Sequence, residues 1–339
     1  MSESGDYNPG VWKGHDFTSA RRSYDAHVGR SYSDAVSAGK GTKDLITEEV
    51  KTDSTAPLII VVDETGSMGD WPATMFSKLP YLENETKEYL GDDAEICFMA
   101  IGDAYCSEQY PLQVRPFAKG LNLAKRLKEL VIEGGGGGQT TETYELAALF
   151  AARKIETPKA IKPIMIFIGD EQCYDTIPKD LAKKLVGITL EKTLTTKEVF
   201  KELTNKYSVY LIRKPYETSS GNTMSSTDKR ITAHWAELIG EDHIAPLPEA
   251  ARVVDVIFGI LAKETNRIAY FEHELEDRQL ADKGGAGKVD AVYKSLKTIH
   301  HITDASRSSG GTGKSVMRKS MKKLTDGTTS KSVKSKSLI

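Results

Sequence analysis

The stretch Leu58-Ile59-Ile60-Val61-Val62-Asp63-Glu64-Thr65-Gly66-Ser67 decides the fold and locates the candidate site. Its five aliphatic residues form a continuous apolar run, which is typical of a strand buried on both faces of a parallel sheet. The run ends at Asp63, and two hydroxyl residues follow at alternate positions, with Gly66 between them to permit a tight turn. The sequence therefore predicts a buried strand followed directly by a polar loop.

Further apolar segments alternate with helical patterns along the chain. We expect strands at 95–101, 113–117, 164–168, 208–213 and 243–247. We expect helices at 71–90, with a kink at Pro80, and at 121–131, 142–155, 197–206, 228–239 and 250–263. Strands that alternate with helices are typical of an α/β fold, in which a mostly parallel sheet has helices on both faces. Ligands bind such sheets at the carboxyl ends of the strands.

Composition divides the chain into four parts. Residues 1–55 are polar and form an N-terminal extension, and 56–265 form the main domain. A helical C-terminal extension follows at 266–305, with a glycine hinge at 284–287, and a basic Ser/Lys-rich tail at 306–339 is expected to be disordered. The tail has nine Lys/Arg and one acidic residue, a charge of +8 within a chain of net charge −2, so the rest carries −10.

The cysteines and the apolar runs indicate a cellular location. Cys97, Cys106 and Cys173 form no C-x-x-C pair, which argues against a disulfide framework and a structural zinc site. The opening MSESGDYNPG lacks a charged start followed by an apolar stretch, so we expect no signal peptide. No apolar run approaches the roughly 18 residues that a membrane span requires. We therefore expect a cytoplasmic protein without membrane contact.

Three loops supply oxygen atoms suited to a metal ion. The donors are Asp63, Thr65 and Ser67 after the first strand, Thr140 and Thr141 after five glycines, and Asp170 after the strand predicted at 164–168. Hydroxyl and carboxylate oxygens suit Mg²⁺, Mn²⁺ or Ca²⁺ rather than zinc. Taken alone, the first loop is weak evidence for a metal site, because it is also compatible with simple helix capping, for which Asp, Ser and Thr are good residues.

The three loops together resemble the metal-ion-dependent adhesion site of von Willebrand factor A domains. In that pattern Asp-x-Ser-x-Ser is followed by a distant Thr and a distant Asp, and the resemblance covers about residues 56–265. It implies a Rossmann-like three-layer fold in which Ser67 and a loop threonine bind the metal directly, with Thr65 in place of the first serine. It also implies that Asp63 and Asp170 act through bound waters and hydrogen bonds.

The sequence leaves the identity of the loop threonine ambiguous. Leu146 follows Thr140 at a spacing associated with the family's first helix, which favours Thr140, while Thr141 is a rival. In the family, a Glu or Asp of a partner protein completes the metal's coordination. Stand-alone bacterial and phage domains of this kind often work beside a MoxR-type AAA+ ATPase. The resemblance thus implies a metal-dependent protein-interaction module rather than an enzyme. Because Glu64 and Glu171 lie beside the site, we expect them to tune its affinity or to repel wrong partners.

Two other classes of function stay open. An RNA-binding scaffold is kept open only by the basic tail, which has no aromatic residue to stack on bases. A metal-dependent hydrolase would need a general base, and no residue is a convincing candidate. Within the tail, the segment 308–315 nearly matches a phosphate-binding loop, but it lacks the first glycine and no apolar strand precedes it.

Overall fold

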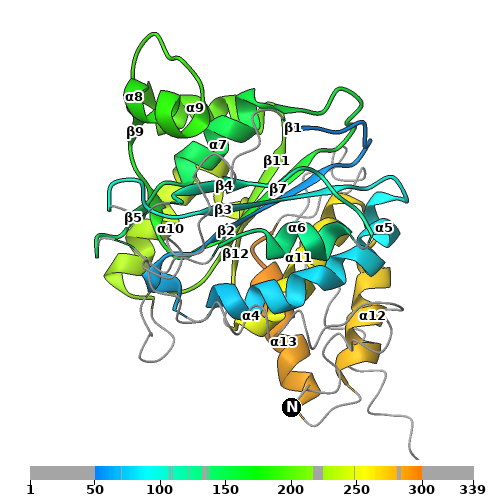
Figure 1. Cartoon of the computed structure of the whole chain (residues 1–339). Coiled ribbons are helices and arrows are strands. Elements are labelled where there is room, and N and C mark those ends of the chain that lie inside the picture. Colours follow the sequence, from blue (N-terminus) through cyan, green and yellow to red (C-terminus); the bar gives the residue numbers. More distant parts are fainter. Residues whose placement is uncertain are drawn as a thin grey trace, which may run out of the picture. The chain divides into compact units, whose positions relative to one another are not determined.

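Six strands form the central sheet in the order β12-β11-β7-β2-β3-β4, and helices cover both of its faces (Figure 1). The structure, a computed structural model, describes residues 50–299 except for Asp70, Ser107, Gln109, Leu121, 132–135, Gly137, 217–223, Pro248 and 281–283. The basic tail, the segment 308–315 and most of the predicted N-terminal extension lie outside the described residues.

Five strands of the sheet run parallel, and β4 at one edge is antiparallel to its neighbour β3. The strands are β2 (Leu58–Asp63), β3 (Ile96–Ile101), β4 (Leu112–Val114), β7 (Ile164–Gly169), β11 (Ser208–Arg213) and β12 (Ile244–Pro246). Every residue of β2, β3 and β7 is buried, as expected for strands covered on both faces. The predicted strands are therefore confirmed, with ends shifted by a few residues.

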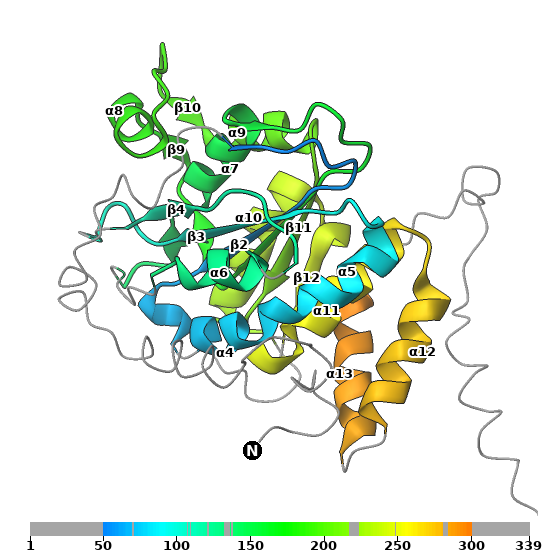
Figure 2. The same ribbon diagram turned by 45° about the vertical axis from the view of Figure 1, so that its right-hand side comes forward.

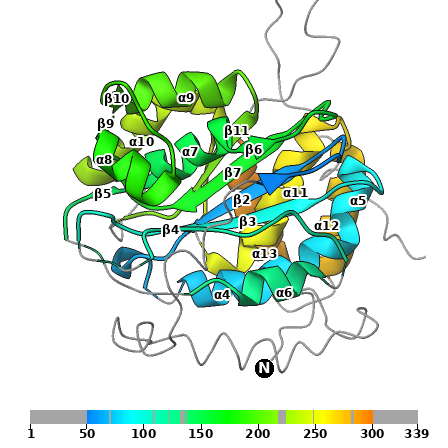
Figure 3. The same cartoon turned by 45° about the horizontal axis from the view of Figure 1, so that its top comes forward.

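Helices on the two faces of the sheet bury alternate residues of β2. One face carries α7 (Tyr144–Arg153), α9 (Thr196–Thr204) and α10 (Ser226–Ile239), which pack with Ile59 and Val61 (Figure 3). The other face carries α4 (Trp71–Lys78), α5 (Leu82–Leu90), α6 (Asn122–Lys128) and α11 (Val253–Glu264), which pack with Leu58, Ile60 and Val62. The predicted three-layer α/β fold is confirmed.

The helix predicted at 71–90 is interrupted where the sequence indicates. A 3-10 turn at Leu79–Tyr81 separates α4 from α5, because Pro80 lacks the amide hydrogen of a regular helix. The helix predicted at 142–155 instead begins at Tyr144, since Thr141–Glu142 forms the short strand β5, which pairs with β8 (Gln172–Cys173).

Several short elements were not predicted. They are β1 (Val50–Lys51) paired with β6 (Ile155–Glu156), β9 (Thr176–Ile177) paired with β10 (Leu194–Thr195), and α8 (Lys179–Leu181) with the π-helical turn Ala182–Val186. Each of these strands has only two residues, too few to produce a recognisable alternation of apolar and polar positions. Among the helices within 50–299 that the structure describes, none is both long and apolar enough to cross a lipid bilayer.

Two C-terminal helices pack side by side against α11 (Figure 2). They are α12 (Ile268–Gln279) and α13 (Gly285–Leu296), and their apolar residues belong to the same cluster as those of α11. Arg278 of α12 donates a hydrogen bond of 2.6 Å to the buried Asp255 of α11. The predicted glycine hinge is wrong, because α13 already begins at Gly285 and only Gly284 adopts a left-handed conformation, with φ of +88°.

Two glycines on these helices give a matched test of the packing. A Cβ atom at Gly259 of α11 would lie 2.1 Å from Leu296 Cδ1 of α13, whereas a Cβ at Gly287 would meet nothing within 4 Å. We predict that Gly287→Ala raises the free energy of unfolding by about 0.5–1 kcal/mol through helix propensity. Gly259→Ala gains the same propensity but overpacks the contact, so it should be less stable than Gly287→Ala by about 1–3 kcal/mol in urea unfolding. Equal stabilities would contradict the observed helix packing.

Candidate metal centre

The candidate centre lies where the order of the strands in the sheet reverses. Strand β2 pairs with β7 on one side and with β3 on the other. The chain adds β3 and β4 on one side of β2, and later adds β7, β11 and β12 on the other side. Asp63 is the last residue of β2, and Asp170 directly follows β7. Because the two strands are parallel neighbours, their carboxyl ends bring both aspartates to the same edge of the sheet. In sheets of this class, ligands usually bind at the carboxyl ends of the strands, at the point where the strand order reverses.

Asp63 is fully buried and organises the loop that follows it. Its Oδ1 atom accepts hydrogen bonds from the backbone N–H of Thr65 at 2.9 Å and from the Thr65 hydroxyl at 2.7 Å. Its Oδ2 atom accepts a hydrogen bond from the hydroxyl of Tyr144 on α7. A carboxylate that binds the backbone two residues ahead closes a tight turn, so the conformation of the loop is set by Asp63 itself.

A second carboxylate orients the next hydroxyl. The Ser67 hydroxyl donates to Asp170 Oδ1 at 3.0 Å, and Ser67 Oγ lies 3.1 Å from Thr65 Oγ1. The structure thus brings Asp63, Thr65, Ser67 and Asp170 together. Since each hydroxyl donates its hydrogen to an aspartate, each oxygen keeps lone pairs for a further ligand.

The spacing of the two hydroxyl oxygens suits a small divalent cation. Ligand oxygens at about 2.0–2.1 Å from Mg²⁺ in octahedral geometry lie about 2.9 Å apart along an edge of the octahedron. The observed 3.1 Å between Thr65 Oγ1 and Ser67 Oγ is close to that value. Within the described ranges, no group of three His, Cys, Asp or Glu side chains is arranged to hold a metal. The candidate donor set instead combines hydroxyls with carboxylates.

Buried acidic groups crowd around these oxygens. Burial, and then the charge of Asp170, raise the pKa of Asp63 to about 7. The same two causes raise the pKa of Glu171 to about 8. Burial and the charge of Asp63 also raise the pKa of Glu142 on β5 far above its ordinary value. One oxygen of Glu142 and one of Glu171 are buried without a hydrogen-bond partner among the described residues. A divalent cation would offset this accumulation of negative charge, so the residues present fit the metal that the sequence predicts.

The two candidate threonines take other hydrogen bonds. Thr140 Oγ1 accepts from Arg230 of α10 at 2.6 Å, and the Thr141 side chain hydrogen-bonds to Tyr174. The glycine-rich loop before them nevertheless passes the centre. A Cβ atom at Gly136 would lie 3.7 Å from the Cβ of Thr65 and 3.5 Å from a Glu142 oxygen, and its φ of +124° favours glycine. That Thr140 or Thr141 is a metal ligand stays a prediction.

Two residues of the centre, Lys214 and Tyr144, were not predicted from the sequence. Lys214 directly follows β11, and its ammonium donates to Asp170 Oδ2 at 2.7 Å and to the Ser67 carbonyl oxygen at 2.9 Å. Its place after a buried strand is the same signal that identified both aspartates. Tyr144 carried no comparable signal, because it lies within an apolar helical pattern.

Neighbouring residues also constrain the centre. A Cβ atom at Gly169 would lie 2.0 Å from the Tyr144 hydroxyl, so only glycine leaves room for Tyr144 to reach Asp63. Glu64, which we expected to tune the site, has its Oε2 atom bound by Gln113 of β4 at 2.9 Å. The charges of Asp170 and Asp63 act on Glu171, the other residue expected to tune the site, and contribute to its raised pKa.

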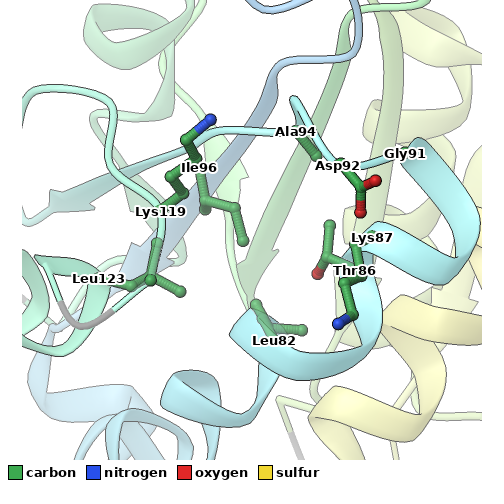
Figure 4. Close-up of a pocket in the computed structure, with 10 residues that line it drawn as sticks. Leu82, Thr86, Lys87, Gly91, Asp92, Ala94, Ile96, Lys119 and Leu123 are labelled. Carbon is green, nitrogen blue, oxygen red and sulfur yellow. The ribbon is translucent and has the colours of Figure 1, made fainter.

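A cavity of about 280 Å³ lies elsewhere, between α5 and α6 (Figure 4). Thr86 and Lys87 of α5 line it on one side, and Leu123 of α6 and Ile96 line it on the other. Ile96 is the first residue of β3, so this cavity lies at the amino end of the strands. None of the predicted metal ligands lines it.

The hydrogen bond from Tyr144 to Asp63 can be tested by removing one hydroxyl. We predict that Tyr144→Phe lowers the free energy of unfolding by about 1.5–3 kcal/mol, because a buried carboxylate loses a donor. Tyr207→Phe is the matched control, since the buried Tyr207 donates to a neutral acceptor, the Ala151 carbonyl oxygen at 3.3 Å, and its side chain also hydrogen-bonds to Thr157. Its loss should cost about 0.5–1.5 kcal/mol. Urea unfolding at pH 8 in EDTA measures both, and equal losses would argue against a special role for Tyr144.

The raised pKa of Glu171 predicts a pH dependence of stability. Folded Glu171 keeps its proton to about pH 8, whereas the unfolded carboxyl loses it near 4.5. The stabilising contribution is therefore complete below pH 4.5 and is lost as the pH rises toward 8. Without metal, the free energy of unfolding of Glu171→Gln should fall less steeply over this window. The difference in slope is at most about 1.4 kcal/mol per pH unit, the value for one proton. If the free energies of unfolding of the wild type and of Glu171→Gln change with pH in parallel, the pKa of Glu171 is not raised by the fold.

Comparison with known proteins reveals only distant structural similarity. No protein-family model matches the sequence, and no curated protein matches it significantly. The pilus adhesin SpaC from Lactobacillus rhamnosus GG, in its open conformation, is 10% identical with a TM-score of 0.43. That alignment covers 66% of this chain and 31% of the adhesin's. The vWF domain of the type V pili tip protein Mfa5 from Porphyromonas gingivalis is 11% identical with a TM-score of 0.41, and 64% of this chain and 97% of that chain are covered. Neither similarity bears on function.

Proposed function

We propose that this chain is a metal-dependent protein-interaction module. A Mg²⁺, Mn²⁺ or Ca²⁺ ion would be held by the hydroxyls of Thr65 and Ser67, and a Glu or Asp of a partner protein would complete its coordination. One observation carries the proposal: the two hydroxyl oxygens lie 3.1 Å apart, and each donates its hydrogen to a buried aspartate. This arrangement aligns the two oxygens before any cation arrives.

The chemistry of these ligands favours binding over catalysis. Hydroxyl oxygens are neutral, so a bound cation keeps most of its charge and attracts a carboxylate strongly. Asp63 and Asp170 would stay behind the hydroxyls and fix their orientation, as carboxylates behind metal ligands commonly do. We accordingly propose that the chain acts by binding and not as an enzyme.

Exposure within the loop indicates the direction from which a partner approaches. Asp63, Thr65 and Asp170 are buried, whereas Gly66 is exposed and Ser67 is half-buried. A partner carboxylate would therefore reach the centre from above Gly66 and Ser67. The class of partner implied by the family resemblance is a MoxR-type AAA+ ATPase, and we propose a cytoplasmic setting for the pair.

A titration with Mn²⁺, followed by electron spin resonance, tests the proposal directly. We predict one saturable site in the full chain and a loss of affinity of roughly 10–100-fold or more in Ser67→Ala. Ser208→Ala is the matched control, because Ser208 is the first residue of β11 and so lies at the amino ends of the strands, away from the centre. This variant should bind Mn²⁺ as the wild type does. Thr140→Val and Thr141→Val then show which threonine, if either, is the third hydroxyl ligand.

Added acetate supplies the partner's carboxylate in this titration. The proposal requires acetate to strengthen Mn²⁺ binding, whereas neutral acetamide should have no effect. If the wild type binds no Mn²⁺ at millimolar concentrations, with acetate as well as without it, the proposed function is wrong.

A further inference from the structure

Lys214 joins three separate segments at the candidate centre. Its backbone follows the register of the sheet, in which Arg213 pairs with Gly169, so Lys214 stands beside Asp170. Its ammonium contacts Asp170 Oδ2 at 2.7 Å and the Ser67 carbonyl oxygen at 2.9 Å. The Nζ atom also lies 5.7 Å from the ring centroid of Trp71, the first residue of α4. The end of β7, the Ser67 loop and the start of α4 therefore share one cation.

Asp170 divides its two oxygens between the serine and the lysine. Oδ1 accepts from the Ser67 hydroxyl and Oδ2 accepts from Lys214, while Lys214 also holds the backbone of Ser67. The side chain of Lys214 is only 13% exposed and that of Asp170 is fully buried. A buried ion pair of this kind holds its neighbours firmly, because breaking it would leave an unpaired charge away from water.

The charges at the centre give Lys214 a second consequence. The buried aspartates behind the hydroxyls offset part of a bound cation's charge, which weakens its attraction for an incoming carboxylate. Lys214 makes the metal-loaded centre one charge unit more positive than it would be without the lysine, so it strengthens that attraction.

We propose that Lys214 is a built-in counter-ion of the candidate centre, which holds the Ser67 loop in place before a cation binds and selects a carboxylate as the final ligand. This inference rests on the proposed function. The same charge repels the incoming metal, so the lysine weakens metal binding while it strengthens binding of the anion. Metal and carboxylate would therefore bind well only together, and each would raise the affinity for the other by the same factor.

Lys214→Met tests the inference, because methionine keeps much of the side-chain length and removes the charge. Mn²⁺ alone should bind more tightly than to the wild type, by roughly fivefold or more. The factor by which acetate strengthens Mn²⁺ binding should fall by a similar amount. Urea unfolding in EDTA gives a readout without metal: the variant should be less stable than the wild type, and Mn²⁺ should restore more stability to it than to the wild type.

Lys206→Met is the matched control. Lys206 is also a half-buried lysine, but it donates to the carbonyl oxygens of Ala151, Ala152 and Ile155. It precedes β11 and so lies at the opposite edge of the sheet from Lys214. Lys206→Met should lose stability without changing the affinity for Mn²⁺ or the effect of acetate.

The possible results separate the inference from the proposed function. If the wild type binds Mn²⁺ and responds to acetate, and Lys214→Met behaves in the same way, the role of Lys214 is refuted and the proposed function stands. If the variant binds Mn²⁺ less tightly, the lysine supports the metal site instead of opposing the metal, which also refutes the inference. If the wild type binds no Mn²⁺ in either condition, both proposals fail.

Discussion

The buried carboxylate of Asp63 is the constraint from which the rest of the centre follows. A charge at the end of a fully buried strand is costly unless hydrogen bonds satisfy it, and three of them do. Two come from Thr65 and fold the loop, and the third comes from Tyr144 on the next layer. Tyr144 reaches Asp63 only because residue 169 is glycine. One carboxylate thereby links the sheet, a helix and the loop.

The buried acidic groups of the centre lower the stability of the fold around them. Asp63, Glu142 and Glu171 all have raised pKa values, which means that the folded chain resists their ionisation. A chain selected for stability alone would have apolar or paired side chains in these positions. The repulsion becomes useful if a cation arrives, because the binding free energy then includes the relief of that repulsion.

Much of the fold could be predicted, because long apolar runs leave few alternatives. The strand at 58–63 and its aspartate followed from the continuous apolar run, and the interruption of the helix followed from Pro80. The two-residue strands β5 and β8 could not be predicted, since their pairing depends on contacts distant in sequence. For the same reason the sequence indicated Thr140 and Thr141 as ligands but not their present partners, Arg230 and Tyr174. Lys214 follows a buried strand just as Asp170 does, but an ammonium group is no ligand for a metal ion, so a pattern of oxygen donors does not include it.

The packing of α11 has a consequence for how the chain can be divided. Every residue of this helix except Lys263 is buried, because the sheet covers one side and α12 and α13 cover another. A helix that is apolar all round has no face suited to water. A fragment ending at residue 265, where the family resemblance ends, would expose the side of α11 that Leu275, Val292 and Leu296 now cover. Such a fragment would expose a new apolar surface to water, so we expect the smallest part of the chain that folds on its own to extend through α13.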